Sequence, residues 1–260
     1  SSNLPGGHEL AIGDWNHTSV RTGETFPVFM DYLSGDQLVS AKRLNNSEQK
    51  NITAPETNRW VEGGPLGKAK TVPLQIDENI EEMTIQLLTA DKLSNLKITD
   101  PSGEIVSPEI KEMQFEEGVF KGAIGYAITI TAPAAGEWNL NLKPAEKEEN
   151  AYLLVADFKA EEFISVKPAQ KSGPVQTNKL ELELDSAKVE TDQLKVVYEI
   201  TETANPDNTK IWKKQGKSSL TQTLNFDKKR TVYTITIHIE GKTKKGNTFK
   251  RTIIDSIYAN

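Results

Sequence analysis

The sequence predicts a mainly β protein, made of tandem antiparallel β-sandwiches that follow a short N-terminal strand-loop-helix segment. Three observations lead to this fold class. From Arg59 onward, short runs that alternate apolar and polar residues recur about every ten residues, a pattern typical of half-buried strands. Pro, Gly, Asn and Asp separate most of these runs, as in turns between antiparallel strands. A polar stretch at 166–178 divides the runs into two groups.

The first predicted domain, 1–58, begins with a short alternating run at 9–12 and a polar, turn-rich loop that contains His17. A helix is expected at 24–33, because its apolar residues recur at i, i+3, i+4 and i+7. These residues are Phe26, Phe29, Met30 and Leu33. The polar chain that follows, 36–58, is expected to be a linker or an exposed loop, with one more helical turn at 37–44 left open.

Residues 59–165 are predicted to form the first sandwich, with a jelly-roll-like arrangement. Its expected strands are 71–76, 83–88, 93–99, 126–131, 137–142 and the more continuously apolar 151–158. Two connections have recognisable turn chemistry, since proline fixes φ and glycine permits positive φ both in Asp100-Pro101-Ser102-Gly103 and at Pro133 to Gly136.

Two tryptophans of this domain are given different expectations. Trp138 alternates with Leu140 and Leu142, so its indole is expected in the core, with stacking on a sugar as the alternative. Trp60 has polar neighbours and is expected to be an exposed or interface aromatic, packing between domains being favoured.

Residues 166–178 gather Pro, Gly, Ser and Lys and are predicted to link the domains. Beyond them, 179–260 is expected to be an immunoglobulin-like sandwich of about 85 residues, without a cysteine pair. The strongest strand signal is 231–239, which alternates Val, Tyr, Thr and Ile. His238 in this strand and His8 near the N-terminus are expected to be structural or solvent-facing.

Two charged segments need an explanation. A hairpin loop with three lysines is predicted at 241–247; we favour lysines that keep a sheet edge from pairing, with weak attachment to an anionic cell-wall polymer or lipid surface as the alternative. Asp77, Glu78, Glu81 and Glu82 form an acidic turn, but they lack the spacing of a calcium loop.

Composition excludes several classes of protein. The net charge of −6 gives no basic footprint for nucleic acid. The chain has no cysteine and only three scattered histidines, so no disulfide, metal site or other cofactor is expected. No apolar run approaches the length of a transmembrane helix. A cysteine-free, Thr- and Asn-rich acidic chain suits an exported bacterial protein, secreted or at the cell surface, although it suits a cytosolic one almost as well.

The loop-histidine-helix order at 9–33 resembles the C-terminal end of α/β-hydrolases of the lipase and esterase type. The resemblance implies that His17 is the general base of a serine nucleophile. No G-x-S-x-G pentapeptide occurs in the chain, so the nucleophile would belong to an N-terminal remainder of the same protein. These 260 residues alone are then expected to be catalytically silent. A histidine in an Asn- and Thr-rich loop also commonly bonds to its own turn, and that alternative stays open.

The turn "DPSG" and the later "PAAGEW" resemble the hemicentin-like and pre-peptidase-like β-sandwiches that accompany hydrolases in secreted proteins. Two functions therefore remain. The chain is the C-terminal portion of an exported serine hydrolase with two accessory sandwiches, or it is a non-catalytic extracellular module for adhesion, surface attachment or substrate binding.

Overall fold

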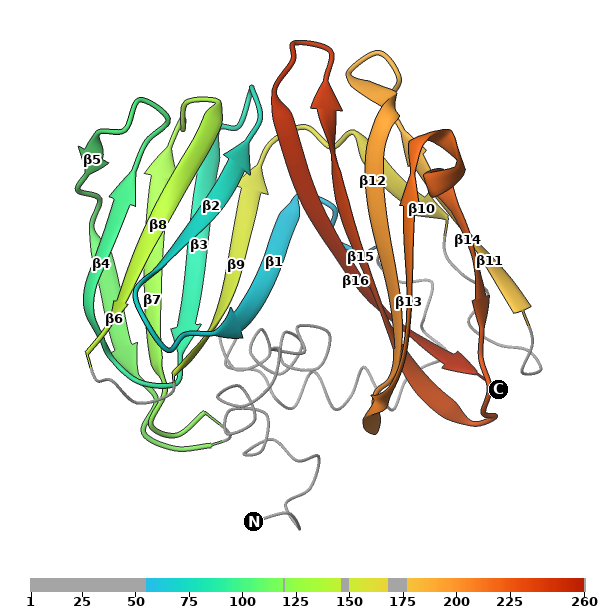
Figure 1. The fold of residues 1–260 in the computed structure, drawn as a ribbon, viewed down its shortest axis with the longest axis horizontal. Coiled ribbons are helices and arrows are strands. Elements are labelled where there is room, and N and C mark those ends of the chain that lie inside the picture. The colour runs from blue at the N-terminus through green and yellow to red at the C-terminus, as the bar shows by residue number, and fades with distance from the viewer. Residues whose placement is uncertain (1–54, 119, 146–149, 168–176, 260) are drawn as a thin grey trace. The chain divides into compact units, whose positions relative to one another are not determined.

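The computed structural model (Figure 1) describes residues 55–118, 120–145, 150–167 and 177–259. These residues form antiparallel sheets, and the helical structure among them is one short 3-10 helix, η3 (Gly216–Leu220). They divide into two compact units, 58–161 with 242–251, and 162–241 with 252–259. The predicted class of mainly β, tandem sandwiches is confirmed. The loop of His17 and the helix expected at 24–33 lie outside the described residues.

The first unit is built from two antiparallel sheets. The larger sheet has the order β1-β9-β3-β7-β6. Its strands are β1 (Arg59–Pro65), β9 (Ala151–Lys159), β3 (Glu82–Thr89), β7 (Ile124–Thr131) and β6 (Ile110–Gln114). The smaller sheet has the order β2-β8-β4-β5. Its strands are β2 (Lys70–Ile76), β8 (Gly136–Pro144), β4 (Leu93–Thr99) and β5 (Ile105–Val106).

The core of this unit contains alternate residues of both sheets, among them Ile85, Leu87 and Leu154 from one and Leu74 and Leu140 from the other. Alternation along a strand sends successive side chains to opposite faces, so one face of each sheet supplies this core. All six strands predicted between 71 and 158 are present, with ends shifted by at most a few residues.

Three strands of this unit were not predicted, each for a physical reason. β1 contains two glycines and ends in proline, which sequence patterns associate with loops. β6 is exposed at all five positions and therefore shows no apolar alternation, while β5 has only two residues.

Trp138 lies in the core as predicted, with 4% of its surface exposed. Its indole Nε1 donates a hydrogen bond to the carbonyl oxygen of Ala134 at 2.8 Å. This bond satisfies the one polar atom that burial of a tryptophan would otherwise leave without a hydrogen bond.

The second unit also has two sheets. One has the order β13-β12-β15-β16 and the other β10-β11-β14. The strands are β10 (Ile164–Lys167), β11 (Thr177–Leu184), β12 (Val189–Glu202), β13 (Asn205–Gln215), β14 (Thr221–Asn225), β15 (Thr231–Thr243) and β16 (Thr248–Ala259). Its buried residues alternate along the strands, as in Val196, Tyr198 and Ile200 of β12.

Two connections are shorter than the sequence suggests. β10 continues to Lys167 and β11 begins at Thr177, so both ends of the expected linker 166–178 are strand, and 168–176 lies outside the described residues. In the same way β15 continues to Thr243, which reduces the expected loop 241–247 to a tight turn. Gly246 takes φ of 92° there, a conformation that glycine adopts without steric penalty.

Within the part of the chain that the structure describes, no helix has the length and apolar character needed to cross a bilayer.

Candidate functional site

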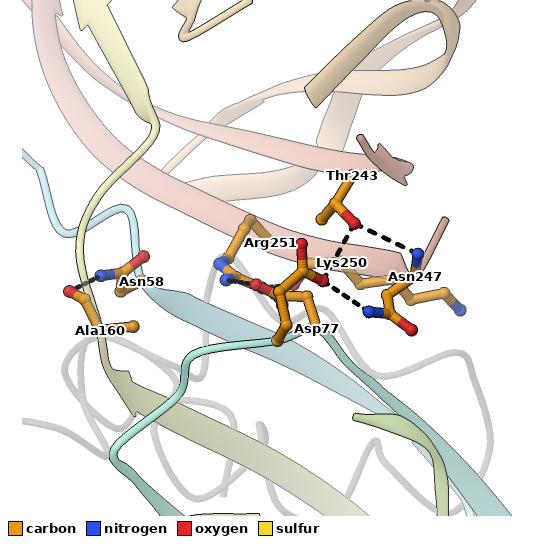
Figure 2. Close-up of polar contacts among 8 residues, drawn as sticks. Asn58, Asp77, Ala160, Thr243, Asn247, Lys250 and Arg251 are labelled. Atoms are coloured by element: carbon orange, nitrogen blue, oxygen red, sulfur yellow. Dashed lines mark hydrogen bonds and ion pairs between the residues drawn. The ribbon is translucent and has the colours of Figure 1, made fainter. Parts of the chain in front are cut away.

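A polar cluster of the first unit contains Asp77, Glu78, Thr243, Asn247 and Arg251, and we call it the hairpin-tip cluster (Figure 2). At its centre Arg251 donates two hydrogen bonds to Asp77, Nη1 to Oδ1 at 2.9 Å and Nη2 to Oδ2 at 3.1 Å. The side chains are 0% and 5% exposed. This is a buried, bidentate ion pair, the geometry in which a guanidinium best matches a carboxylate.

Strand periodicity places both partners. Asp77 follows the last residue of β2, where the fully buried Ile76 ends the strand. Arg251 occupies the same face of β16 as the buried Phe249 and Ile253. Its guanidinium lies 4.6 Å from the ring centroid of Phe158, a cation–π contact that covers the apolar side of the charge.

Glu78, next in the chain, binds the turn of the hairpin. Its Oε2 accepts hydrogen bonds from Asn247 Nδ2 at 2.6 Å and from Thr243 Oγ1 at 3.0 Å. Burial alone would raise the pKa of Glu78, but these bonds, a backbone N–H and the charge of Lys245 together hold the pKa below its ordinary value. The carboxylate is therefore stabilised in its charged form.

A second acidic group, Glu62 of β1, lies near the same hairpin. Burial raises the pKa of Glu62 above its ordinary value, although a hydrogen bond with Trp60 and the charges of Lys250 and Lys70 oppose the shift. The ammonium of Lys250 lies 5.3 Å from the centroid of the Trp60 ring. Trp60 itself is partly buried against the core of the first unit.

The contacts of the hairpin-tip cluster indicate a structural role. Asp77 and Glu78 are both bound by side-chain donors of the hairpin. Where the structure describes the chain, it does not bring three or more His, Asp or Glu side chains together in a way that could hold a metal ion. The geometry supports a structural clamp of the hairpin tip onto the β2–β3 turn.

The structure describes some of the residues singled out by the sequence and not others. His17 and His8 lie outside the described residues, so the catalytic role predicted for His17 stays a prediction. His238 is partly buried, and its Nδ1 lies 3.0 Å from the hydroxyl of Thr252, which confirms a structural role. Asp77 and Glu78 of the acidic turn belong to the hairpin-tip cluster, while Glu81 lies 3.7 Å from Lys159.

Several basic residues near the hairpin have bonding partners within the chain. Lys242 donates to the hydroxyl of Thr248 at 2.7 Å. Arg251 is buried, and Lys250 lies over Trp60.

The Asp77–Arg251 pair and the buried position of Glu62 were not predicted from the sequence. The available signal was Arg251 itself, because it stands in the apolar register of Phe249 and Ile253 in a clear strand pattern. A charge at such a position requires a buried partner of opposite sign. Its partner is 174 residues away in sequence, so the identity of that partner could not be predicted.

No family model matches the chain, and no curated protein matches it. Among solved structures, the lipase BlEst2 of Bacillus licheniformis in its propeptide form matches with a TM-score of 0.52 and 22% identity. The match covers 91% of this chain and 46% of the lipase chain, so the present chain spans less than half of that protein. At this identity the match shows a shared fold.

Two further structures match at TM-scores too low to indicate a shared fold. A β-1,2-glucanase of Parabacteroides distasonis has a TM-score of 0.23 at 10% identity, over 78% of this chain and 31% of that one. A putative membrane anchored protein of Corynebacterium diphtheriae has 0.24 at 10% identity, over 77% and 52%.

Proposed function

We propose that this chain is the accessory, two-sandwich portion of an exported lipase-type ester hydrolase, and that His17 is the general base it contributes. The observation that supports the proposal is the fold match, which extends over 91% of this chain and 46% of a lipase chain. The loop-histidine-helix order expected at 9–33 independently favours the same class of enzyme.

In this proposal the reaction is divided between two parts of one protein. His17 takes the proton of a serine hydroxyl as the serine attacks the ester carbonyl, and returns it to the leaving alcohol. The serine needs a strained G-x-S-x-G turn, which the 260 residues do not contain. The nucleophile and the acid therefore come from residues N-terminal to Ser1. The sandwiches take no part in proton transfer.

The test uses the complete natural protein. We expect its gene to encode a G-x-S-x-G motif upstream of the codon for Ser1, and the purified protein to hydrolyse a p-nitrophenyl ester. His17→Ala should abolish most of this turnover, because removal of a triad member costs several orders of magnitude in kcat. His8→Ala is the matched control and should leave the rate unchanged. An unchanged rate in His17→Ala would remove His17 from the mechanism.

The 260-residue chain alone should show no esterase turnover, and measurable turnover by it would contradict the proposal. An upstream sequence without a hydrolase motif would instead leave the second candidate, a non-catalytic extracellular module for adhesion or surface attachment. Arg251 is buried against Asp77, which speaks against attachment to an anionic surface through this residue.

A further inference from the structure

Among the described residues, the large apolar side chains that are exposed all lie on strands at the edge of a sheet. They are Ile105 on β5, Ile110 and Met113 on β6, Ile211 on β13 and Tyr258 on β16. β6 ends the larger sheet of the first unit, and β13 ends one sheet of the second (Figure 1). An edge strand presents backbone N–H and C=O groups that another strand can bind, so exposed apolar residues there favour pairing with a further strand.

The edge at β6 is acidic. Residues 104–117 contain five glutamates, all exposed, and one basic residue, Lys111. The glutamates are Glu104, Glu109, Glu112, Glu116 and Glu117. Glu112 Oε2 lies 3.5 Å from Lys92 Nζ, but both side chains are exposed, and such a pair contributes little. The exposed Ile110 and Met113 therefore lie in a negatively charged surrounding.

The edge at β13 is basic. Residues 208–217 contain four lysines and no acidic residue. The lysines are Lys210, Lys213, Lys214 and Lys217. Ile211 stands among them and is 52% exposed. Lysines on an edge strand keep it from pairing with a like edge, but they attract an edge of opposite charge.

We propose that β6 of one copy of this chain pairs with β13 of a second copy. The two edges are complementary in charge, and each has exposed apolar residues. The antiparallel register that places Glu112 opposite Lys210 also places Glu109 opposite Lys213. Opposite charges that face each other across two strands stabilise a sheet. A shift by two residues in either direction loses both ion pairs.

The same register agrees with the faces of the two sheets, because it places Ile110 opposite Trp212. Within its own sheet Ile110 pairs with Ile128, which faces the core of the first unit. Trp212 pairs with Tyr198, which is fully buried in the second unit. The core-side residues of both strands would thus point to the same side, as a continuous sheet requires.

This pairing goes beyond the proposed function and does not depend on it. Each copy has one acidic and one basic edge, so the contact is heterologous, between two different surfaces of identical chains. Pairing of β6 with β6 would bring two acidic edges together, and pairing of β13 with β13 two basic ones. Repulsion between like charges disfavours both of these alternatives.

Charge reversal tests the pairing in the 260-residue chain. Self-association is measured by sedimentation up to about 1 mM, where even a weak pairing is populated. Lys210→Glu with Lys213→Glu should weaken it about tenfold, because two attractive pairs become repulsive. Adding Glu109→Lys and Glu112→Lys to that variant should restore it. A chain that stays monomeric at about 1 mM, or a fourfold variant that associates no better than the double one, would overturn the proposal.

The matched control has the same change of net charge at other places. Lys97→Glu with Lys143→Glu alters two exposed positions on β4 and β8 of the first unit. This variant should associate as the unmodified chain does. An equal loss in the control variant would mean that only net charge matters, and it would overturn the pairing of the two edges.

Thiols on separate copies test the register, since the chain has no cysteine of its own. Met113 stands opposite Thr209 in this register, close enough for a disulfide. A mixture of Met113→Cys and Thr209→Cys chains should therefore form the mixed disulfide in preference to either homodimer. Met113→Cys with Lys97→Cys is the control and should show no such preference. An excess of Met113→Cys homodimers, or equal mixed yields in both mixtures, would overturn the proposal.

Discussion

Arg251 and Asp77 form a bidentate ion pair in which both side chains are almost completely buried, although 174 residues separate them in sequence. Removing two charges from water is unfavourable, and only close geometry with further hydrogen bonds compensates for it. The second bond of Nη1, to the carbonyl of Lys250 at 3.0 Å, and the ring of Phe158 supply part of this compensation.

Replacing Arg251 by methionine should destabilise the chain by about 3–5 kcal/mol, because it leaves the Asp77 carboxylate buried without its counter-ion. Urea unfolding of the 260-residue chain, followed by tryptophan fluorescence, measures the change. Arg59→Met is the matched control. Arg59 pairs with Asp157 at 2.6 Å, but its side chain is 20% exposed and that of its partner 33%, so the loss should be about 1 kcal/mol.

The double variant Asp77→Leu with Arg251→Met tests whether the loss of stability in Arg251→Met comes from the uncompensated charge of Asp77. If the loss comes from an uncompensated charge, removing both charges should recover much of the stability. A single Arg251→Met variant that loses no more stability than Arg59→Met would contradict a buried, compensating pair.

Glu78 should stabilise the chain at neutral pH. Its pKa is lower in the folded chain than the ordinary 4.5. Its contribution is therefore present above that value and is lost as pH falls through the folded pKa. Glu78→Gln should lower stability by about 1 kcal/mol at neutral pH, and the difference should shrink in acid. Unfolding curves recorded across this pH range measure it, and a pH-independent loss would contradict the assignment.

Glu62 should behave in the opposite way. Burial raises its pKa above 4.5 in the folded chain, so stability is fully present below 4.5 and is lost as pH rises through the folded pKa. Glu62→Gln should therefore match the unmodified chain in acid and exceed its stability at neutral pH. The opposite signs of the two glutamate variants make each the control for the other.

The sequence predicted the β class and most core strands because their information is local. The runs 83–88 and 231–239 alternate strongly, and they appear as β3 and β15. Trp138 was placed in the core by its register with Leu140 and Leu142. Alternation thus decides which face of a strand is buried, and it does so without knowledge of the neighbouring strands.

The hairpin-tip cluster could not be predicted in the same way, because its contacts are long-range. Glu78 binds Thr243 and Asn247 across 165 and 169 residues. The lysines at 242–245 are the most conspicuous residues of this loop in the sequence. The donors to Glu78 are instead the uncharged side chains of Thr243 and Asn247. Edge strands such as β6 escaped prediction since exposure on all sides removes the alternating signal.

Two turns that the sequence predicted separately lie against each other, and this gives a test of packing. A Cβ at Gly136 would lie 2.8 Å from Cβ of Pro101, and φ there is 133°. Gly136→Ala should therefore destabilise the chain by about 1–3 kcal/mol. At Gly67 a Cβ would meet nothing within 4 Å, so Gly67→Ala should be nearly neutral. Thermal unfolding of both variants measures the contrast, and equal midpoints would refute the close contact.

The hydroxyl of Tyr198 ties the core of the second unit to η3. Tyr198 is 0% exposed, and its Oη donates to the carbonyl oxygen of Ser219 at 2.5 Å. Tyr198→Phe leaves this buried acceptor without its donor, which should destabilise the chain by about 1–3 kcal/mol. Tyr258→Phe removes the same atom from a side chain that is 39% exposed, and it should change stability by less than about 0.5 kcal/mol. Urea unfolding of the two variants should thus give clearly different midpoints, since only the buried hydroxyl has no water to replace it. Equal midpoints would mean that the Ser219 carbonyl finds another donor.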